Sequence, residues 1–175
     1  MTAPAPDAIA PLDHFPAEPL QTAEGQVLDA WLDHNGHMNV AYYLLVFDRA
    51  TDRFHALLGK TAGYIERTGC STFALEQHLT YQRELLPRSP YRVFTRLVDH
   101  DAKRIHMLHR MYHATEGWLA ATCESINMHI DLTARRSTPF PEDITSRLAR
   151  LAAAQASLPP EEFAGRRVGI RRKNP

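Results

Sequence analysis

The longest regular pattern of hydrophobic residues follows Asn39. Asn39 is a favoured residue at helix N-caps and Gly59 is a favoured residue at helix ends, so we predict a helix between them. The first half of this segment, residues 40–47, is apolar on nearly every side, which predicts that this end of the helix is buried all round. Apolar side chains recur close to the 3.6-residue helical period at Val40, Tyr43, Leu44, Phe47, Ala50, Phe54, Leu57 and Leu58.

Four strand-like runs follow the helix, and a fifth strand is predicted ahead of it at residues 26–32. Short polar turns separate the four runs, which predicts antiparallel neighbours. One long central helix wrapped by a curved antiparallel sheet of about five strands is an α+β fold. Such a sheet leaves edges and an outer face uncovered, so we expect a homodimer or homotetramer. The four runs are residues 70–82, in which Phe73, Leu75, Leu79 and Tyr81 alternate with Glu76, His78, Thr80 and Gln82, and residues 91–99, 104–114 and 118–132.

The 12 prolines indicate where the folded domain begins and ends. Five lie at or before Pro19 and five at or after Pro139, and proline interrupts helix interiors and central strands alike. We therefore expect a flexible proline-rich arm at 1–23, a folded domain at 24–132 and a C-terminal extension at 133–175. The extension carries a predicted helix at 141–157. The extension ends in a basic tail, which either binds phosphates or is a solvated chain end. The tail contains Arg166, Arg167, Arg171, Arg172 and Lys173.

Composition narrows the class of protein. A length of 175 residues suggests one domain, and the 20 basic residues are balanced by 20 acidic ones, which argues against nucleic acid held by a bulk positive field. Two cysteines, Cys70 and Cys123, do not make a disulfide framework. No apolar run reaches the roughly 18 residues of a membrane span, and the N-terminus lacks a signal-peptide pattern. We expect a cytoplasmic protein without nucleic-acid or membrane partners.

The densest polar cluster, residues 31–39, stands at the start of the apolar helix. Asp33 is its sole carboxylate, and it can attack a carbonyl carbon or deprotonate a water that attacks. A helix start offers free N–H groups and partial positive charge, which stabilise a developing oxyanion. The alternative is structural: Asp33, His34 and Asn35 form an Asx turn and Asn39 caps the helix.

The string Asp33-x-x-Gly36-His37-Met38-Asn39, with Tyr42-Tyr43 behind it in the helix, resembles the signature of hotdog-fold acyl-CoA thioesterases, relatives of 4-hydroxybenzoyl-CoA thioesterase. The resemblance covers about residues 24–132. It implies a hotdog fold and hydrolysis of acyl-CoA, with Asp33 as nucleophile or general base. It further implies that the Val40 backbone N–H polarises the thioester carbonyl and that His37 and Asn39 shape the loop. No cofactor is implied, because coenzyme A is part of the substrate and product.

Further strings resemble the betainyl-CoA thioesterase branch of this family, which acts in bacterial carnitine breakdown. They include Ala41-Tyr-Tyr-Leu, Leu75-Glu-x-His, Lys103-Arg-x-His and His129-Ile-Asp. The implied substrate presents a trimethylammonium group, which aromatic faces and a carboxylate bind well. The alternative is that these aromatic residues are simply core and that the strand residues face solvent. The candidates are Trp31, Tyr42, Tyr43 and Trp118, with Glu76 and His78 on a strand expected to line the acyl pocket across a dimer interface.

Lys103 and Arg104 form the candidate binding site for the phosphates of coenzyme A. The resemblance implies that basic residues at this turn contact the nucleotide phosphates, and an ordinary solvated turn is the alternative. We expect no metal site, because His-Glu-x-x-His and Cys-x-x-Cys are both missing. Two other functions stay open. One is a hotdog hydratase or dehydratase, for which Asp48 and His55 are the available acid–base residues, and the other is a non-catalytic acyl-CoA-binding protein.

Overall fold

The computed structural model describes residues 9–170 of the chain, and it confirms the α+β class. The predicted central helix, the four strands after it and the C-terminal helix are all present, with bounds that differ by a few residues at most. The elements are β1 (Leu20–Gln26), the 3₁₀ helix η2 (Asp29–Trp31), α1 (Val40–Leu57), α2 (Ala62–Thr68), β2 (Cys70–Tyr81), β3 (Pro90–His100), β4 (Arg104–His113), β5 (Leu119–Asp131), β6 (Arg136–Ser137) and α3 (Glu142–Ala154).

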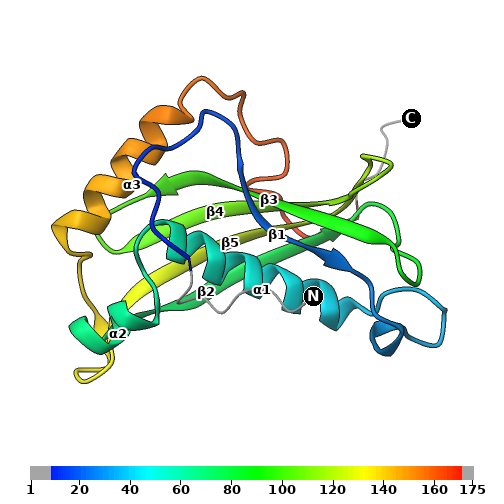
Figure 1. The fold of residues 1–175 in the computed structure, drawn as a ribbon, viewed down its shortest axis with the longest axis horizontal. Coiled ribbons are helices and arrows are strands. Elements are labelled where there is room, and N and C mark those ends of the chain that lie inside the picture. The colour runs from blue at the N-terminus through cyan, green and yellow to red at the C-terminus, as the bar shows by residue number, and fades with distance from the viewer. Residues whose placement is uncertain (1–8, 171–175) are drawn as a thin grey trace.

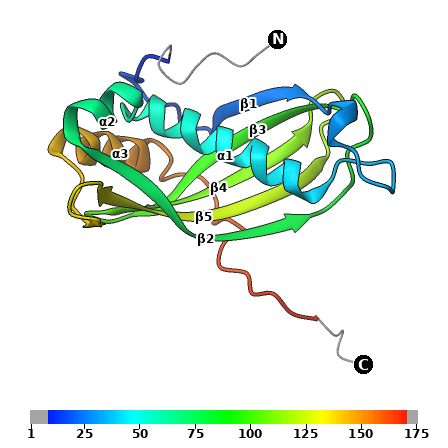
Figure 2. The same cartoon turned by 90° about the horizontal axis from the view of Figure 1, so that it is seen from below.

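The strands form one antiparallel sheet in the order β1-β3-β4-β5-β2, with the short β6 paired to β5. Helix α1 lies across one face of this curved sheet (Figure 1). Figure 2 shows α1 on one side of the sheet and the C-terminal segment leaving on the other. We call the side of α1 the inner face and the opposite side the outer face. The two edges of the sheet are β1 and β2.

Helix α1 begins where the sequence predicts, because the Asn39 side-chain oxygen accepts the Ala41 N–H at 3.0 Å. Phe47 and Phe54 are fully buried against the sheet. The expectation that the first half is buried all round is wrong for the single chain. Val40 is 58% exposed and Leu44 is 39% exposed, because the sheet covers only one side of the helix.

The strand predicted at residues 26–32 is also wrong. The observed β1 spans Leu20–Gln26 and pairs with β3, whereas residues 27–32 are a loop that contains η2. The inward position of β1 is polar: Thr22 is buried, and its hydroxyl lies 2.6 Å from that of Thr95. Because a polar residue occupies this buried position, the sequence of β1 lacks the alternation of apolar and polar residues that would have indicated a strand.

A β-bulge at Leu75 divides β2 into two halves with opposite facing. Beyond the bulge, Leu79 packs against the core and Tyr81 meets Tyr43 edge-on at 5.3 Å, so both lie on the inner face. Before the bulge, Phe73 pairs with Met128 on the outer face. The single alternation predicted from Phe73 to Tyr81 is therefore wrong at its first residue.

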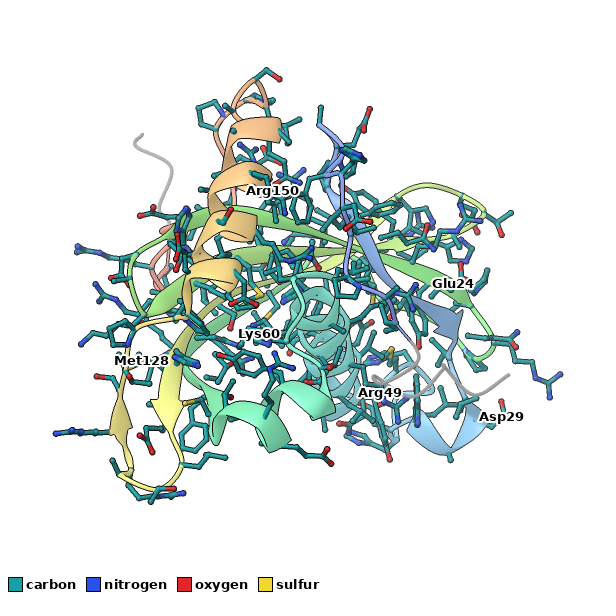
Figure 3. The ribbon with its side chains drawn as sticks, turned by 60° about the vertical axis from the view of Figure 1, so that its left-hand side comes forward. Glu24, Asp29, Arg49, Lys60, Met128 and Arg150 are labelled. Atoms are coloured by element: carbon teal, nitrogen blue, oxygen red, sulfur yellow. The ribbon has the colours of Figure 1, made fainter. Side chains whose placement is uncertain are left out.

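The segment ahead of β1 is held by α3. The guanidinium of Arg147 donates to the Leu12 carbonyl at 2.6 Å, and that of Arg150, labelled in Figure 3, donates to the Asp13 carbonyl at 3.2 Å. Phe15 packs against the buried cluster around Phe54. This cluster fills the end of the molecule where α1 ends and where α2 and α3 lie. Among residues 9–170, no helix is long and apolar enough to cross a membrane.

Candidate active site

Residues 31–39 form a tight hairpin directly ahead of α1. The Asn39 N–H donates to the Trp31 carbonyl at 2.9 Å, and the Asp33 N–H donates to the His37 carbonyl at 3.0 Å. Gly36 turns the chain with a φ of 79°, a left-handed conformation that favours glycine. The hairpin is fixed to the rest of the protein because the Met38 N–H donates to the carbonyl of Leu85 at 2.9 Å.

The Asp33 carboxylate lies in this hairpin with 15% of its side chain exposed. The backbone N–H of Asn35 donates to Oδ1 at 2.8 Å, which is the Asx turn that the sequence offered as the structural alternative. This N–H is the main cause of a pKa below the ordinary value for Asp33, and the charges of His37 and His34 lower the pKa further. The Asx turn therefore orients the carboxylate and holds it in its ionised form.

The start of α1, which directly follows this hairpin, offers a free donor. The side chain of Asn39 is occupied by the Ala41 N–H, and the Asn39 carbonyl accepts from Tyr42. Within residues 9–170, the Val40 N–H donates to no acceptor. Such an N–H, at the positive end of a helix dipole, is suited to a developing oxyanion.

His37 connects Asp33 to a carboxylate that the sequence did not reveal. Its Nδ1 lies 3.8 Å from Asp33 Oδ1, and its Nε2 lies 3.8 Å from Glu84 Oε2. Glu84 belongs to the connection between β2 and β3, which also supplies the Leu85 carbonyl for the hairpin. No motif marks Glu84, since only the fold brings this loop against residues 31–39.

The predicted aromatic residues gather behind the hairpin. Trp31 is buried and stacks on Tyr42, with ring centroids 5.3 Å apart, and on Tyr91 at 6.5 Å. Tyr43 accepts the Leu85 N–H at its hydroxyl. Tyr91 was missed because an aromatic residue at a strand position is typical of an ordinary core. Trp118 packs against the same core but has other partners, because it stacks on His113 and lies under the guanidinium of Arg83.

Glu76 and His78 are not brought to Asp33 within one chain. They lie beyond the bulge on β2, opposite Ile126 and Glu124, and therefore on the outer face of the sheet. Glu76 is exposed, and His78 is partly buried. In a single chain this position fits the alternative that these strand residues face solvent, and their place in a pocket shared with a second copy stays a prediction.

Lys103 and Arg104 also lie far from Asp33. Lys103 ends the turn before β4 and Arg104 is the first residue of β4, at the end of the molecule where α1 ends. The 18-residue α1 separates that end from Asp33 by roughly 27 Å. Lys103 Nζ donates to Ser137 Oγ at 3.2 Å, and Arg104 Nε donates to Asp101 at 2.7 Å. That ion pair lowers the pKa of Asp101 to about 2.

The basic tail is described only in part. Arg166 lies over the ring of Phe163 at 4.1 Å, and its Nε donates to the Glu162 carbonyl. Arg167 is exposed. The other three basic positions, Arg171, Arg172 and Lys173, lie outside the described residues.

The residues considered for hydratase chemistry do not form a pair. Asp48 is exposed on α1, whereas His55 is buried, and its Nε2 has no hydrogen-bond partner among residues 9–170. Burial lowers the pKa of His55 well below its ordinary value. In the described part of the chain, no three His, Cys, Asp or Glu side chains are grouped as metal ligands would be.

Comparison with known proteins assigns the chain to a family. Residues 27–148 match the family model of the thioesterase-like superfamily. The chain belongs to this superfamily. A betainyl-CoA thioesterase from Pseudomonas aeruginosa is 38% identical over 151 residues, which cover 86% of this chain and 95% of that protein.

Two further relatives of this thioesterase-like chain agree with the match. An L-carnitine dehydrogenase/betainyl-CoA thioesterase from Rhizobium meliloti is 32% identical over 88% of this chain, which spans 31% of that larger protein. A hypothetical protein from Staphylococcus aureus, solved in complex with CoA, is 29% identical with a TM-score of 0.81 over 88% of this chain and 98% of its own. The hotdog fold and the thioesterase class predicted from the sequence are confirmed.

Proposed function

We propose that this thioesterase hydrolyses betainyl-CoA to betaine and CoA, with Asp33 as its catalytic carboxylate. One observation carries the proposal: the hairpin that holds the ionised Asp33 leads directly into α1, whose first residue, Val40, has a free N–H. The 38% identity to a betainyl-CoA thioesterase supports the choice of acyl group. Coenzyme A enters as part of the substrate and leaves as a product.

Two routes are open to Asp33. In the first, the carboxylate attacks the thioester carbonyl, the C–S bond breaks with CoA leaving as thiolate, and water hydrolyses the resulting anhydride. In the second, Asp33 removes a proton from a water that attacks the carbonyl, and the C–S bond breaks in the same way. In both routes the Val40 N–H and the helix dipole stabilise the oxyanion. Asn39 holds the donor in place by capping the helix.

The substrate's cation needs aromatic faces and negative charge. The stack of Trp31 on Tyr42 lies behind the hairpin, with Tyr43 next along the helix. His37 and the exposed carboxylate of Glu84 lie on the same hairpin and on the loop that contacts it. A trimethylammonium group gains from both kinds of partner, so these residues support a cationic acyl group.

We infer that the complete site needs a second copy of the chain. Edge strand β2 exposes three apolar side chains, Phe73, Leu75 and Tyr81, and the start of α1 exposes Val40 and Leu44. A two-fold dimer that pairs β2 with β2 places the beginning of one strand beside the end of the other. That arrangement moves Lys103 and Arg104 of one chain toward the Asp33 end of its partner, where CoA phosphates would lie. Glu76 and His78, on the same strand, would lie at this contact.

The central test is the variant Asp33→Asn with betainyl-CoA as substrate. Asparagine keeps the size of the side chain but neither attacks nor takes a proton, so thiol release should fall at least about a hundredfold. Asp29→Asn is the matched control, because Asp29 is an exposed carboxylate on the same side of the molecule. Retained turnover in Asp33→Asn would contradict the mechanism. Thioester binding without thiol release in the wild type would favour the non-catalytic alternative.

The acyl group is tested in the same assay with 3,3-dimethylbutanoyl-CoA, in which carbon replaces the quaternary nitrogen. Cation–π contact and a nearby carboxylate favour the charged acyl group, so kcat/KM for betainyl-CoA should be about tenfold higher or more. Equal values for the two substrates would defeat the betainyl assignment and leave the thioesterase mechanism intact.

A further inference from the structure

A cavity of about 270 Å³ lies on the outer face, where the proposed mechanism has no role for it. Thr95 and His109 point inward, and His109 hydrogen-bonds Thr51 of α1. Because side chains alternate along a strand, the neighbouring Phe94, Arg96 and Arg110 face outward. The sheet therefore separates this cavity from α1 and Asp33.

Two guanidinium groups form one wall of the cavity. Arg96 and Arg110 both pair with Glu161, whose side chain is only 7% exposed, so two positive charges meet one negative charge. The Nε atoms of both arginines are buried and have no hydrogen-bond partner among residues 9–170. These Nε atoms are covered by the protein, so the feature that favours an anion is the positive charge that the pair holds in excess of Glu161, and a carboxylate is the anion that suits guanidinium geometry.

The rest of the lining is aromatic and acidic. The rings of Phe94 and Tyr112 meet edge-on with centroids 6.1 Å apart. Glu18, which is exposed, contributes to the lining from the segment ahead of β1 and forms no ion pair within the described part of the chain. Aromatic rings and a carboxylate together favour an organic cation. The four charged residues sum to zero, which matches a ligand without net charge but with separated charges.

We propose that this outer-face cavity binds a small zwitterionic carboxylate. Its carboxylate lies on Arg96 and Arg110, and its cationic group faces the two rings and Glu18. A volume of 270 Å³ equals that of roughly nine water molecules in the liquid, enough for a molecule of the size of glycine betaine. The proposal is independent of the thioesterase activity, because the cavity and Asp33 lie on opposite faces of the sheet.

Glycine betaine is the probe, and backbone amide NMR of the full-length wild-type protein is the measurement. Titration should shift the amides of residues 94–96 and 108–112. Propionate and tetramethylammonium each carry one half of the charge pattern, so each should bind at least about tenfold more weakly. Shifts confined to residues 33–40 would mean binding at the active site alone and would overturn the proposal. Equal affinity for tetramethylammonium would also overturn it.

Two variants assign the binding to this cavity. Tyr112→Leu removes a ring and leaves the pairing of Arg110 with Glu161 in place, whereas Arg110→Gln removes the guanidinium. Each variant should lower the affinity of the outer-face cavity for glycine betaine by about tenfold or more. Met128→Leu, on the same face but outside the cavity lining, is the matched control and should bind as the wild type does. Undiminished binding by Tyr112→Leu would refute the assignment, whether or not Arg110→Gln folds.

Discussion

His109 is a histidine whose protonation state is fixed by its neighbours. The Thr51 hydroxyl donates to the Phe47 carbonyl at 3.0 Å, so it can only accept from His109 Nε2, which lies 3.0 Å away. The other ring nitrogen, Nδ1, then accepts from the Thr95 hydroxyl at 2.7 Å. This neutral tautomer links β3, β4 and α1. Burial lowers the pKa of His109 to about 3.

Acid should therefore destabilise the fold through His109. The unfolded imidazole titrates near pH 6.5, so between about 6.5 and about 3 the unfolded state binds more protons than the folded state. The free energy of unfolding should fall as the pH drops through this range, by up to about 1.4 kcal/mol per pH unit for this one group. Denaturant titrations at several pH values should show a smaller slope for His109→Gln. His14→Gln, at an exposed histidine, should keep the wild-type slope, and identical slopes for all three proteins would contradict the prediction.

At the scale of elements, the N-cap of α1 serves both stability and chemistry. Asn39→Ala removes the acceptor of the Ala41 N–H and should lower the free energy of unfolding by about 1 kcal/mol. Because the same turn positions the Val40 N–H, turnover should fall as well. Asn39→Asp keeps an acceptor and should retain most of the stability. Chemical denaturation and thiol release measure the two effects, and an Ala variant unchanged in both would show that the cap is dispensable.

The long elements could be predicted from the sequence because their patterns are long. Helix α1 repeats its apolar spacing over 18 residues, and β2 to β5 each contain at least ten. Strand β1 has only seven residues. The hydroxyl of its buried Thr22 finds its hydrogen-bond partner in β3, which only the fold brings close. The bulge at Leu75 is equally invisible, since it depends on how β2 pairs with β5.

The residues of the candidate site also divide into those that a local motif predicts and those that only the fold brings together. Asp33, Asn39 and Val40 are neighbours along the chain, so a local motif was enough to propose them together. Glu84 and Tyr91 reach the hairpin from the β2–β3 connection and from β3, and no spacing rule links them to it. The bulge also decides the face of Glu76, which pairs with Ile126 on the outer side.

At the scale of the whole molecule, the dimer proposal makes Leu75 a sensitive position. Leu75 is 53% exposed on edge strand β2, and a charge there should oppose pairing with a second β2. Leu75→Lys should shift the protein to a monomer in sedimentation equilibrium and reduce thioesterase activity in parallel. Leu28→Lys is the matched control, at a leucine 52% exposed beyond β1, on the opposite edge of the sheet. An active monomer would show that one chain holds the complete site.

The hydrogen bonds from α3 to residues 12 and 13 have a consequence for folding during synthesis on the ribosome. The Leu12 and Asp13 carbonyls bond to arginines 135 and 137 residues later in the chain, and β1 pairs only with β3. Residues 12 and 13 therefore lack these two contacts until α3 has been translated, although the Leu12 N–H already has its acceptor in α1, the Leu57 carbonyl. The closure of α3 over residues 12 and 13 must follow the synthesis of nearly the whole chain, so it belongs to the last steps of folding.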